Sequence, residues 1–344
     1  MARRRRRRHR GGPMVLVVAA GLIAGGWLYV ADRGESAGEA GETTTAAAKA
    51  TAQPAATEVP DGIAHAQPTS RPGRGHNGDA VPLAAATPGG AASRAAALLA
   101  SGREALRDQD WLTARARLNA AFRVGVEEPQ RAQLLGDLQR VADETILSPL
   151  AYEGDAFTAS YLVQSGDTLG KIAAAHHVTT GLLARINGLR NINIIRVGQN
   201  LKVIEGPFHA IVEKRSYALD VYIGDTPETR VFVRRFRVGL GAGGATPRGR
   251  WRVKNKLRNP EYYPPRGGRI IPADDPENPL GERWIGLLGL SGAALGQQRY
   301  GIHGTIEPDS IGQDASLGCI RMYNEDVAVL YDLLVVRHST VEVR

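Results

Sequence analysis

Residues 32–92 are rich in alanine, threonine, glycine and proline and contain almost no aromatic or large aliphatic side chains. Such a segment cannot bury enough apolar surface to offset the conformational entropy that it would lose on folding. We therefore expect a disordered tether, whose roughly 60 residues would have a root-mean-square reach of about 40–45 Å. The folded structure must come from the rest of the chain. With 344 residues and 43% hydrophobic content, the chain is long enough for two or three domains.

An uncharged apolar run precedes the tether. Residues 13–31 span about 19 positions, which is enough for one membrane-spanning helix. The arginines before it predict that residues 1–12 stay in the cytoplasm and that everything after the run lies outside. A cleavable signal peptide is the alternative, but a cut after Ala31 would have the bulky Tyr29 two positions upstream. We expect an uncleaved single-pass anchor.

The charge distribution argues against nucleic acid as a partner. The formal charge is +8 at pH 7, but seven arginines, Arg3 to Arg8 and Arg10, lie within the first ten residues. Without them the charge would be +1, so no basic domain remains to neutralise a phosphate backbone.

Residues 93–150 have helical periodicity, interrupted at Asp108 to Asp110 and again before Pro129. The segment around Trp111 resembles one tetratricopeptide-type hairpin. Stable arrays of such hairpins need about three repeats, so we expect a packing or spacer role, with partner binding as the alternative.

Residues 160–205 read as strand, helix, helix, strand. Asp167 and Thr168 are suited to cap the first helix, and Thr179 or Thr180 the second. We expect His176 and His177 to lie within the first helix, without the partners that a metal site would need.

Residues 208–344 alternate apolar and polar side chains in strand fashion, with one helix predicted near 325–334. Gly239, Gly241 and Gly244 match a dinucleotide-binding pattern, but that pattern requires a helix directly after it. A strand-like run at 251–254 follows instead, so we reject a nucleotide site.

The segment 300–323 carries the strongest chemical signal. His303 lies sixteen positions before Cys319, the only cysteine in the chain. Either residue alone is more often structural, since free cysteine behaves as a small buried hydrophobe. Together, with Gly304 and Gly318 beside them, they favour a thiol nucleophile with an imidazole base. A lone cysteine cannot form an intramolecular disulfide, which suits a reactive thiol outside the cytoplasm.

These residues also resemble a known family. H-G-T at 303–305 and S-x-G-C-I-R-M at 316–322 are similar to the L,D-transpeptidase (YkuD-type) catalytic domain, and the likeness covers 208–344. The segments TPRGRW (246–251), RNPEYYPP (258–265), NPLGERWIGL (278–287) and MYNEDVAVLYDLL (322–334) extend it. One departure is Leu317, where many members have a histidine.

The resemblance implies a mechanism and roles for residues. Cys319 would attack a peptidoglycan stem peptide, release D-alanine and form a thioester, which an amine resolves into a 3–3 cross-link. The carbonyl of Gly304 would orient His303, and N–H groups around Gly318 and Cys319 would bind the oxyanion. We expect the thiolate of Cys319 to be populated at pH values well below the usual pKa of a thiol. We also expect carbapenems to acylate Cys319. No metal or other cofactor is needed. Further candidates for substrate binding are Arg321, which could hold a substrate carboxylate, and Ser316 and Tyr300. For Arg321 a structural salt bridge is the alternative.

Residues 161–204 resemble a LysM module, which implies binding to glycans that contain N-acetylglucosamine. The family's two binding loops correspond here to Gly166, Asp167, Thr168 and Leu169, and to Asn187, Gly188 and the segment near Ile194. For Asp167 a capping role, and for Leu169 a core role, are the alternatives.

The expected fold class is therefore a multidomain α+β chain: a helical hairpin region, a LysM β-α-α-β module and a strand-rich β-sandwich catalytic domain. We expect a bacterial membrane-anchored enzyme that acts in the periplasm or cell wall. Two alternatives stay open. The same site with water as acceptor would make an L,D-carboxypeptidase or hydrolase, and an inert second domain would leave a wall-binding scaffold.

Overall fold

The computed structural model describes residues 88–265 and 267–344. The arginine-rich segment 1–12, the apolar run 13–31 and most of the tether lie outside these residues. Within the described part of the chain, no helix combines the length and apolarity required to cross a membrane.

Three α-helices form the first described region: α1 (Pro88–Arg107), α2 (Trp111–Val124) and α3 (Gln130–Ala142). A π-helical turn, η1 (Asp143–Leu147), extends α3. The Asp110 carboxylate caps α2 by accepting the N–H of Thr113 at 3.2 Å. The predicted end of the tether at residue 92 is wrong, because α1 begins at Pro88. Proline is tolerated there since the first helical N–H groups have no intrahelical partner.

The LysM-like segment has the predicted order of elements. It runs β1 (Thr158–Leu162), α4 (Leu169–Ala175), α5 (Thr180–Ile186) and β2 (Asn200–Ile204), and the two strands pair antiparallel. Thr168 caps α4 by accepting Lys171 N–H, and Thr179 caps α5 by accepting Leu182 N–H. Asp167 is not the cap, because its carboxylate accepts the backbone N–H of Gln164 and the hydroxyl of Tyr161.

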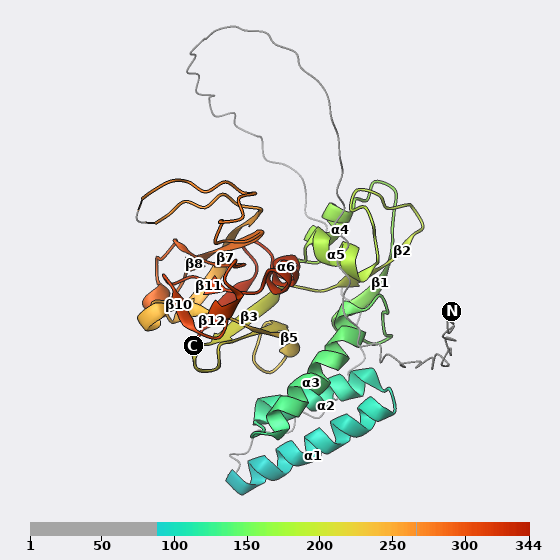
Figure 1. Cartoon of the computed structure of the whole chain (residues 1–344). Coiled ribbons are helices and arrows are strands. Elements are labelled where there is room, and N and C mark those ends of the chain that lie inside the picture. Colours follow the sequence, from blue (N-terminus) through green and yellow to red (C-terminus); the bar gives the residue numbers. More distant parts are fainter. Residues whose placement is uncertain (1–87, 266) are drawn as a thin grey trace, which may run out of the picture. The chain divides into compact units, whose positions relative to one another are not determined.

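The C-terminal region, several of whose strands are labelled in Figure 1, contains an eight-stranded mixed sheet with the order β11-β9-β8-β7-β12-β3-β4-β5. Its strands are β3 (Phe208–Glu213), β4 (Ala218–Ile223), β5 (Val231–Arg237), β7 (Gly249–Arg258), β8 (Arg283–Gly289), β9 (Tyr300–His303), β11 (Ile320–Arg321) and β12 (Thr340–Val343). A two-stranded sheet pairs β6 (Leu240–Gly241) with β10 (Asp314–Ser316), and α6 spans Asn324–Leu333. Short 3₁₀ turns lie at Lys214–Ser216, Ala242–Gly244, Gly292–Ala294 and Pro308–Ser310.

This sheet curls so that both halves line one core. Phe208 and Val221 from one half and Ile285 and Ile302 from the other are fully buried in the same cluster. The predicted multidomain α+β fold class is therefore confirmed, with the strand-rich domain built from one curled sheet. The glycine pattern at 239–244 leads into a 3₁₀ turn and then β7, so no α-helix opens after it.

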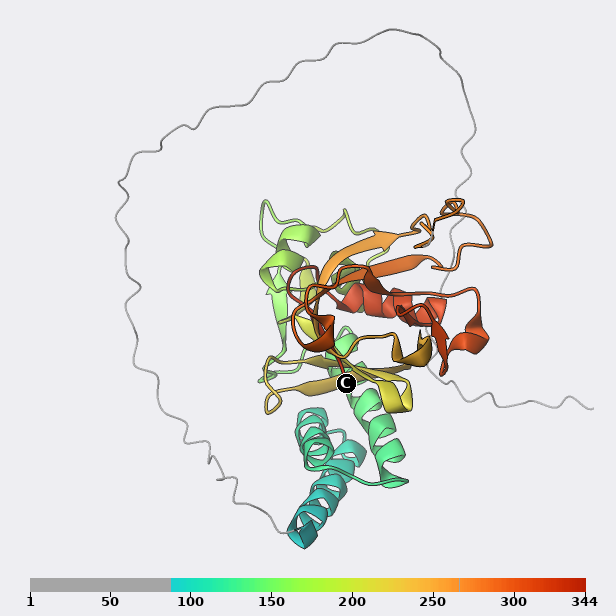
Figure 2. The same cartoon turned by 90° about the vertical axis from the view of Figure 1, so that its left-hand side faces the viewer.

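The helical region covers the outer face of β3, β4 and β5. Leu118 and Leu138 from the helices share a second core with Ile211, Tyr222 and Phe232 from the strands. In Figure 2 the helices lie below these yellow strands. The Asn119 side chain accepts the backbone N–H of Phe232 at 2.7 Å, which ties α2 to β5. The expected packing role thus has a specific partner, the sheet.

The LysM segment also contacts α6. The guanidinium of Arg185 donates to the Asp332 carboxylate at 2.7 Å, and the Thr179 hydroxyl donates to the Asp332 carbonyl.

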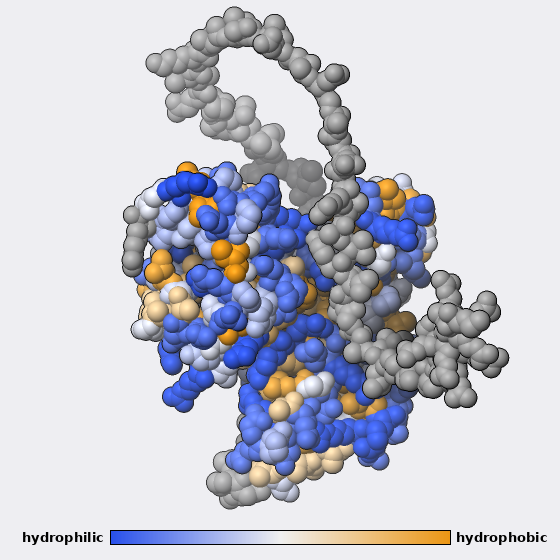
Figure 3. Space-filling model, viewed as in Figure 1, coloured by the Kyte–Doolittle hydropathy of each residue, from blue (hydrophilic) through white to orange (hydrophobic). Residues whose placement is uncertain are grey.

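On the face drawn in Figure 3, the described surface is mostly hydrophilic with small apolar patches.

Candidate active site

Adjacent parallel strands bring His303 and Cys319 together. In the β9–β11 pairing, Ile320 lies opposite Ile302 and Arg321 opposite His303. His303 ends β9, and Cys319 immediately precedes β11. Across this pair Cys319 lies two register positions from His303, and both residues line the same cleft.

His303 is held in one orientation and one tautomer. Its ring is buried, with 5% of the residue exposed, and stacks on Trp284, its partner across β8 and β9, at 5.8 Å between ring centroids and 19° between ring planes. Nδ1 donates to the carbonyl oxygen of Gly304 at 2.6 Å, because a carbonyl can only accept. Nε2 is consequently the basic nitrogen. The expected contact with Gly304 is present.

Burial keeps this imidazole neutral. The pKa of His303 is lowered to about 4, mainly by desolvation; the Gly304 carbonyl opposes this effect, and the charge of Arg321 adds to it. At neutral pH the ring is therefore able to accept a proton.

The thiol of Cys319 is protonated in the free protein. Burial raises its pKa, an effect that a backbone hydrogen bond from Gly301 and the charge of Arg321 oppose only in part. The thiol contacts the carbonyl oxygen of Arg299 at 4.0 Å. The expectation of a thiolate populated below the usual thiol pKa is therefore wrong: both members of the pair rest in the neutral form because ionising either one in this site costs desolvation.

Cys319 lies in a tight turn formed with Ser316 and Gly318. Ser316 Oγ accepts the N–H of Gly318 at 3.0 Å and donates to the carbonyl of Cys319 at 2.6 Å. Gly318 has φ of +134°, and a Cβ there would lie 2.7 Å from Cε1 of Tyr300. Thr246 Oγ1 donates to the Gly318 carbonyl at 2.9 Å. Only glycine fits this position.

Three predicted roles change with this geometry. The Gly318 N–H is already bonded to Ser316, which leaves the N–H of Cys319 as the candidate oxyanion donor. Ser316 stabilises the turn through its two hydrogen bonds, whereas the sequence predicted a role in substrate binding. Tyr300 packs under the turn, against Trp251 at 5.3 Å between ring centroids, and does not line the cleft.

Arg321 forms an ion pair with Glu307 at 2.6 Å. Its Nε is buried without a hydrogen-bond partner in the described structure, and the residue lines the cleft beside His303. Its charge acts on both catalytic candidates, since it lowers the pKa of His303 and of Cys319.

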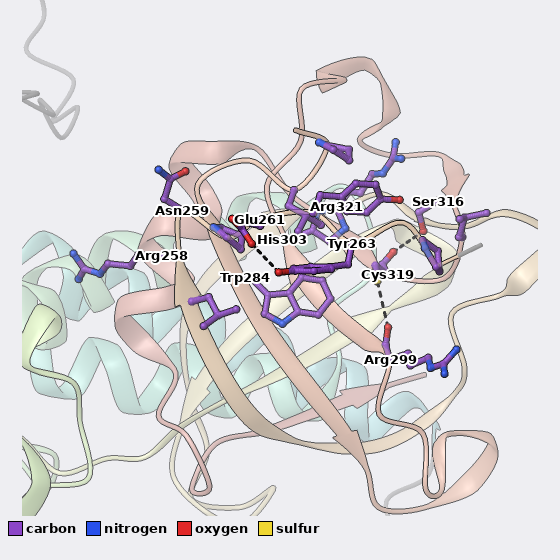
Figure 4. Close-up of a pocket in the computed structure, with 17 residues that line it drawn as sticks. Arg258, Asn259, Glu261, Tyr263, Trp284, Arg299, His303, Ser316, Cys319 and Arg321 are labelled. Carbon is purple, nitrogen blue, oxygen red and sulfur yellow. Dashed lines mark hydrogen bonds between the residues drawn. The ribbon is translucent and has the colours of Figure 1, made fainter. Parts of the chain in front are cut away.

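A cleft of about 840 Å³ opens over the pair (Figure 4). Besides the predicted residues it is lined by Tyr262, Tyr263, Trp284, Arg258 and Arg299, and by the exposed side chain of Leu317. No role was predicted from the sequence for the first five of these residues. The sequence signal that could have pointed to them is their place in the family-like segments RNPEYYPP and NPLGERWIGL, which contain three aromatic side chains of the cleft, Tyr262, Tyr263 and Trp284.

The LysM candidates divide between surface and interior. Gly166, Thr168, Gly188 and Ile194 are exposed. Leu169 is buried in the core at 2% exposure, so it has the core role. The Asn187 amide binds Leu183 and Lys202 backbone groups and joins α5 to β2. Apolar side chains that were not predicted are exposed on the same module: Leu162, Ile192 and Val197.

The two adjacent histidines lie at the end of α4 and not within it as expected. His176 is the C-cap residue, and His177 has a left-handed φ of 52°. In the described residues, no group of three or more metal-ligating side chains forms a candidate metal site.

Comparison with known proteins identifies the strand-rich C-terminal region and the LysM-like segment before it. The family model of the L,D-transpeptidase catalytic domain matches residues 207–343, and that of the LysM domain matches 161–203. The putative L,D-transpeptidase YkuD of Bacillus subtilis is 32% identical over 183 residues, which are 51% of this chain and 93% of the relative. The chain belongs to the L,D-transpeptidase family.

Other members of the L,D-transpeptidase family show shorter matches. The putative L,D-transpeptidase YqjB of B. subtilis is 35% identical over 134 residues, 38% of this chain and 68% of the relative. The solved L,D-transpeptidase from Mycobacterium smegmatis is 20% identical with a TM-score of 0.29, and the match covers 43% of this chain and 64% of that structure. This chain therefore spans less than two thirds of that solved relative.

Proposed function

We propose that this protein is a peptidoglycan L,D-transpeptidase that forms 3–3 cross-links through a thioester on Cys319. The observation that carries the proposal is the neutral, buried imidazole of His303. The Gly304 carbonyl holds its Nδ1–H, and Nε2 is left free to act as a base one strand away from the only thiol. This pairing supplies general-base activation of a nucleophile.

In the first step, Cys319 Sγ attacks the carbonyl between the third stem residue and the terminal D-alanine while His303 Nε2 takes the thiol proton. Because both groups rest neutral, proton transfer accompanies the attack. The Cys319 N–H stabilises the oxyanion. Collapse breaks the C–N bond, His303 returns the proton to the departing D-alanine amine, and a thioester remains.

In the second step, an amine of a neighbouring stem attacks the thioester. His303 accepts the amine proton and delivers it to the departing sulfur of Cys319. One acyl bond replaces another, so this chemistry needs no ATP, metal or other cofactor.

The LysM domain would hold the enzyme on N-acetylglucosamine-containing glycan. Gly166, Thr168, Gly188 and Ile194 are exposed in its loops, beside the apolar Ile192 and Val197, which suit the apolar faces of sugar rings. Binding there raises the local concentration of stem peptides at the cleft without new chemistry. The isolated segment 157–205 should pellet with insoluble peptidoglycan and be competed off by chitin oligomers.

We also propose that residues 13–31 anchor the protein in the cytoplasmic membrane, with the rest of the chain outside in the periplasm or cell wall. The support is the arginine cluster before an uncharged apolar run. Protease added to spheroplasts should remove the catalytic domain. A soluble mature form beginning near residues 32–40 would instead indicate a cleaved signal peptide.

The decisive experiment incubates the full-length enzyme with defined tetrapeptide muropeptides and identifies products by mass spectrometry. A 3–3 dimer that disappears in Cys319→Ala supports the proposal. Release of D-alanine without any dimer would identify an L,D-carboxypeptidase with the same site. Cross-linking that persists in Cys319→Ala would refute the mechanism and leave Cys319 without a catalytic role.

A further inference from the structure

A second cavity lies on the outer face of the sheet, the face that the helices partly cover. Its volume is about 450 Å³, and its lining comes from β3, β4, β7, β12 and the loop that follows β4. None of its lining residues belongs to the catalytic cleft. The residues that supply its chemistry are His209, Asp225, Arg230, Arg250, Glu342 and Arg344.

The tautomer of His209 follows from its contacts. The backbone N–H of Thr340 points at Nδ1 from 3.1 Å, and the Thr340 hydroxyl is 2.8 Å from the same nitrogen. Because a backbone N–H only donates, Nδ1 is the acceptor and the neutral ring carries its hydrogen on Nε2. Burial lowers the pKa of His209, which keeps the ring neutral.

Two buried donors in this cavity lack an acceptor. His209 Nε2 and Arg230 Nε are both buried without a hydrogen-bond partner in the described structure. The nearest carboxylate oxygen to His209 Nε2 belongs to Asp225 at 3.8 Å, beyond hydrogen-bond distance, on a side chain that is 86% exposed. Buried donors without partners are rare and costly, so this pair calls for an acceptor from outside the chain.

The charges around these donors are mainly positive. Glu342 is already occupied, because Arg344 binds it through contacts of 2.8 and 3.0 Å. Arg250 lies opposite Glu342 in the β7–β12 pairing, and its charge helps the bound Arg344 to lower the pKa of that carboxyl, but among the described residues its guanidinium has no carboxylate within salt-bridge distance. Arg230 has its guanidinium carbon 5.2 Å from the centroid of the Tyr222 ring and likewise has no carboxylate partner among the described residues. Two guanidinium groups and one imidazole N–H are thus available together.

We propose that this cavity binds an oxyanion, a carboxylate or phosphate group carried on a small organic body, at a site separate from the catalytic cleft. Arginine and imidazole N–H donors match oxygen acceptors of this kind, and bonds to charged acceptors are stronger than neutral ones. The volume exceeds that of a single anion, so part of the ligand beyond the anionic group would also be enclosed.

Calorimetric titration of the full-length protein tests the proposal, with glycerol 1-phosphate and N-acetyl-D-alanine as probes. At least one probe should bind saturably, and the probe that binds tells phosphate from carboxylate. Arg250→Ala should weaken binding about tenfold or more, since it removes a charge-assisted bond. Asp225→Asn should tighten binding, because it removes a competing carboxylate near His209 Nε2.

Arg258→Ala is the matched control, since Arg258 is a similarly exposed arginine that lines the catalytic cleft. It should leave probe affinity unchanged. Absence of saturable binding for both probes would overturn the proposal. So would binding that is lost in Arg258→Ala but kept in Arg250→Ala, because the anion would then occupy the cleft. Both Arg250 and Asp225 are exposed, so neither substitution threatens the fold.

Discussion

At the scale of single residues, burial sets the protonation states of the candidate catalytic pair, His303 and Cys319. Desolvation lowers the pKa of His303 and raises that of Cys319, so an ion pair is disfavoured before substrate arrives. The base is nevertheless available at neutral pH because its pKa, about 4, lies well below 7. Such a thiol would resist nonspecific oxidation, which proceeds through the thiolate, until a substrate carbonyl is in place.

The first prediction concerns pH. His303 is unprotonated above its pKa of about 4 and loses its base function as the pH falls through that value. The rate of Cys319 acylation by a carbapenem should therefore change little between pH 7 and 5 and fall below about 4. Intact-protein mass spectrometry at timed intervals measures it.

His303→Gln is the control for this pH profile: it should acylate slower by a factor on the order of 100 or more, without the inflection near pH 4. An inflection of the wild-type rate near pH 6.5 would show that burial does not depress this histidine.

A second prediction concerns Gly318. Alanine there would hold a left-handed φ of +134° and place its Cβ 2.7 Å from Tyr300. Gly318→Ala should destabilise the protein by about 1–3 kcal/mol and displace Cys319 enough to abolish turnover.

Gly136→Ala is the matched control for Gly318→Ala, since that glycine lies within α3 and a Cβ added to it would meet no atom within 4 Å. Because alanine favours a helix more than glycine does, Gly136→Ala should raise the free energy of unfolding by roughly 0.5–1 kcal/mol. Thermal unfolding compares the two, and a harmless Gly318→Ala would contradict the assigned turn.

At the scale of elements, buried and half-buried polar side chains join segments that are distant in sequence. Asn119 connects α2 to β5, and the Arg234 guanidinium on β5 pairs with Asp143 at the start of η1. The buried ammonium of Lys202 on β2 donates to carbonyls of Thr145 and Ser148, at 2.8 and 3.0 Å. Such bonds satisfy the carbonyls that a helix end leaves without partners.

A third prediction tests the α2–β5 link. Asn119→Ala should lower the free energy of unfolding by about 1–3 kcal/mol, because the Phe232 N–H would remain buried without an acceptor. Denaturant titration measures this loss. Gln133→Ala, which removes an exposed amide from α3, should change the unfolding free energy by no more than about 0.5 kcal/mol. Equal effects of the two substitutions would mean that the buried bond contributes nothing specific.

At the scale of the whole molecule, the helical region shields apolar residues of the large sheet from solvent. It covers Ile211, Tyr222 and Phe232, which would otherwise form an apolar patch on the outer face of the sheet. Exposed patches of that kind favour association.

A fourth prediction follows for fragments. A protein of residues 150–344 should unfold at a lower temperature than one of residues 88–344, bind hydrophobic dyes and aggregate, although both contain Cys319 and the LysM domain. Differential scanning fluorimetry and light scattering compare them. Should the shorter fragment prove equally stable and monomeric, the helices would be a spacer, as the single-hairpin pattern alone allowed.

The sequence by itself proposed Cys319 and His303 as nucleophile and base, predicted the LysM order of elements, and placed Thr168 and Thr179 among the candidate caps. These features depend on side chains close together in the chain, whose hydrogen bonds and spacing leave a local pattern. Only the tertiary structure decided the protonation of Cys319 and His303, the bracing role of Ser316, the cover that the helices provide and the cavity around His209. The bonds of Ser316 are local but need the backbone conformation of the turn at Gly318. The other features depend on burial by segments that are distant in the chain, and desolvation leaves no periodic or local signature in the sequence.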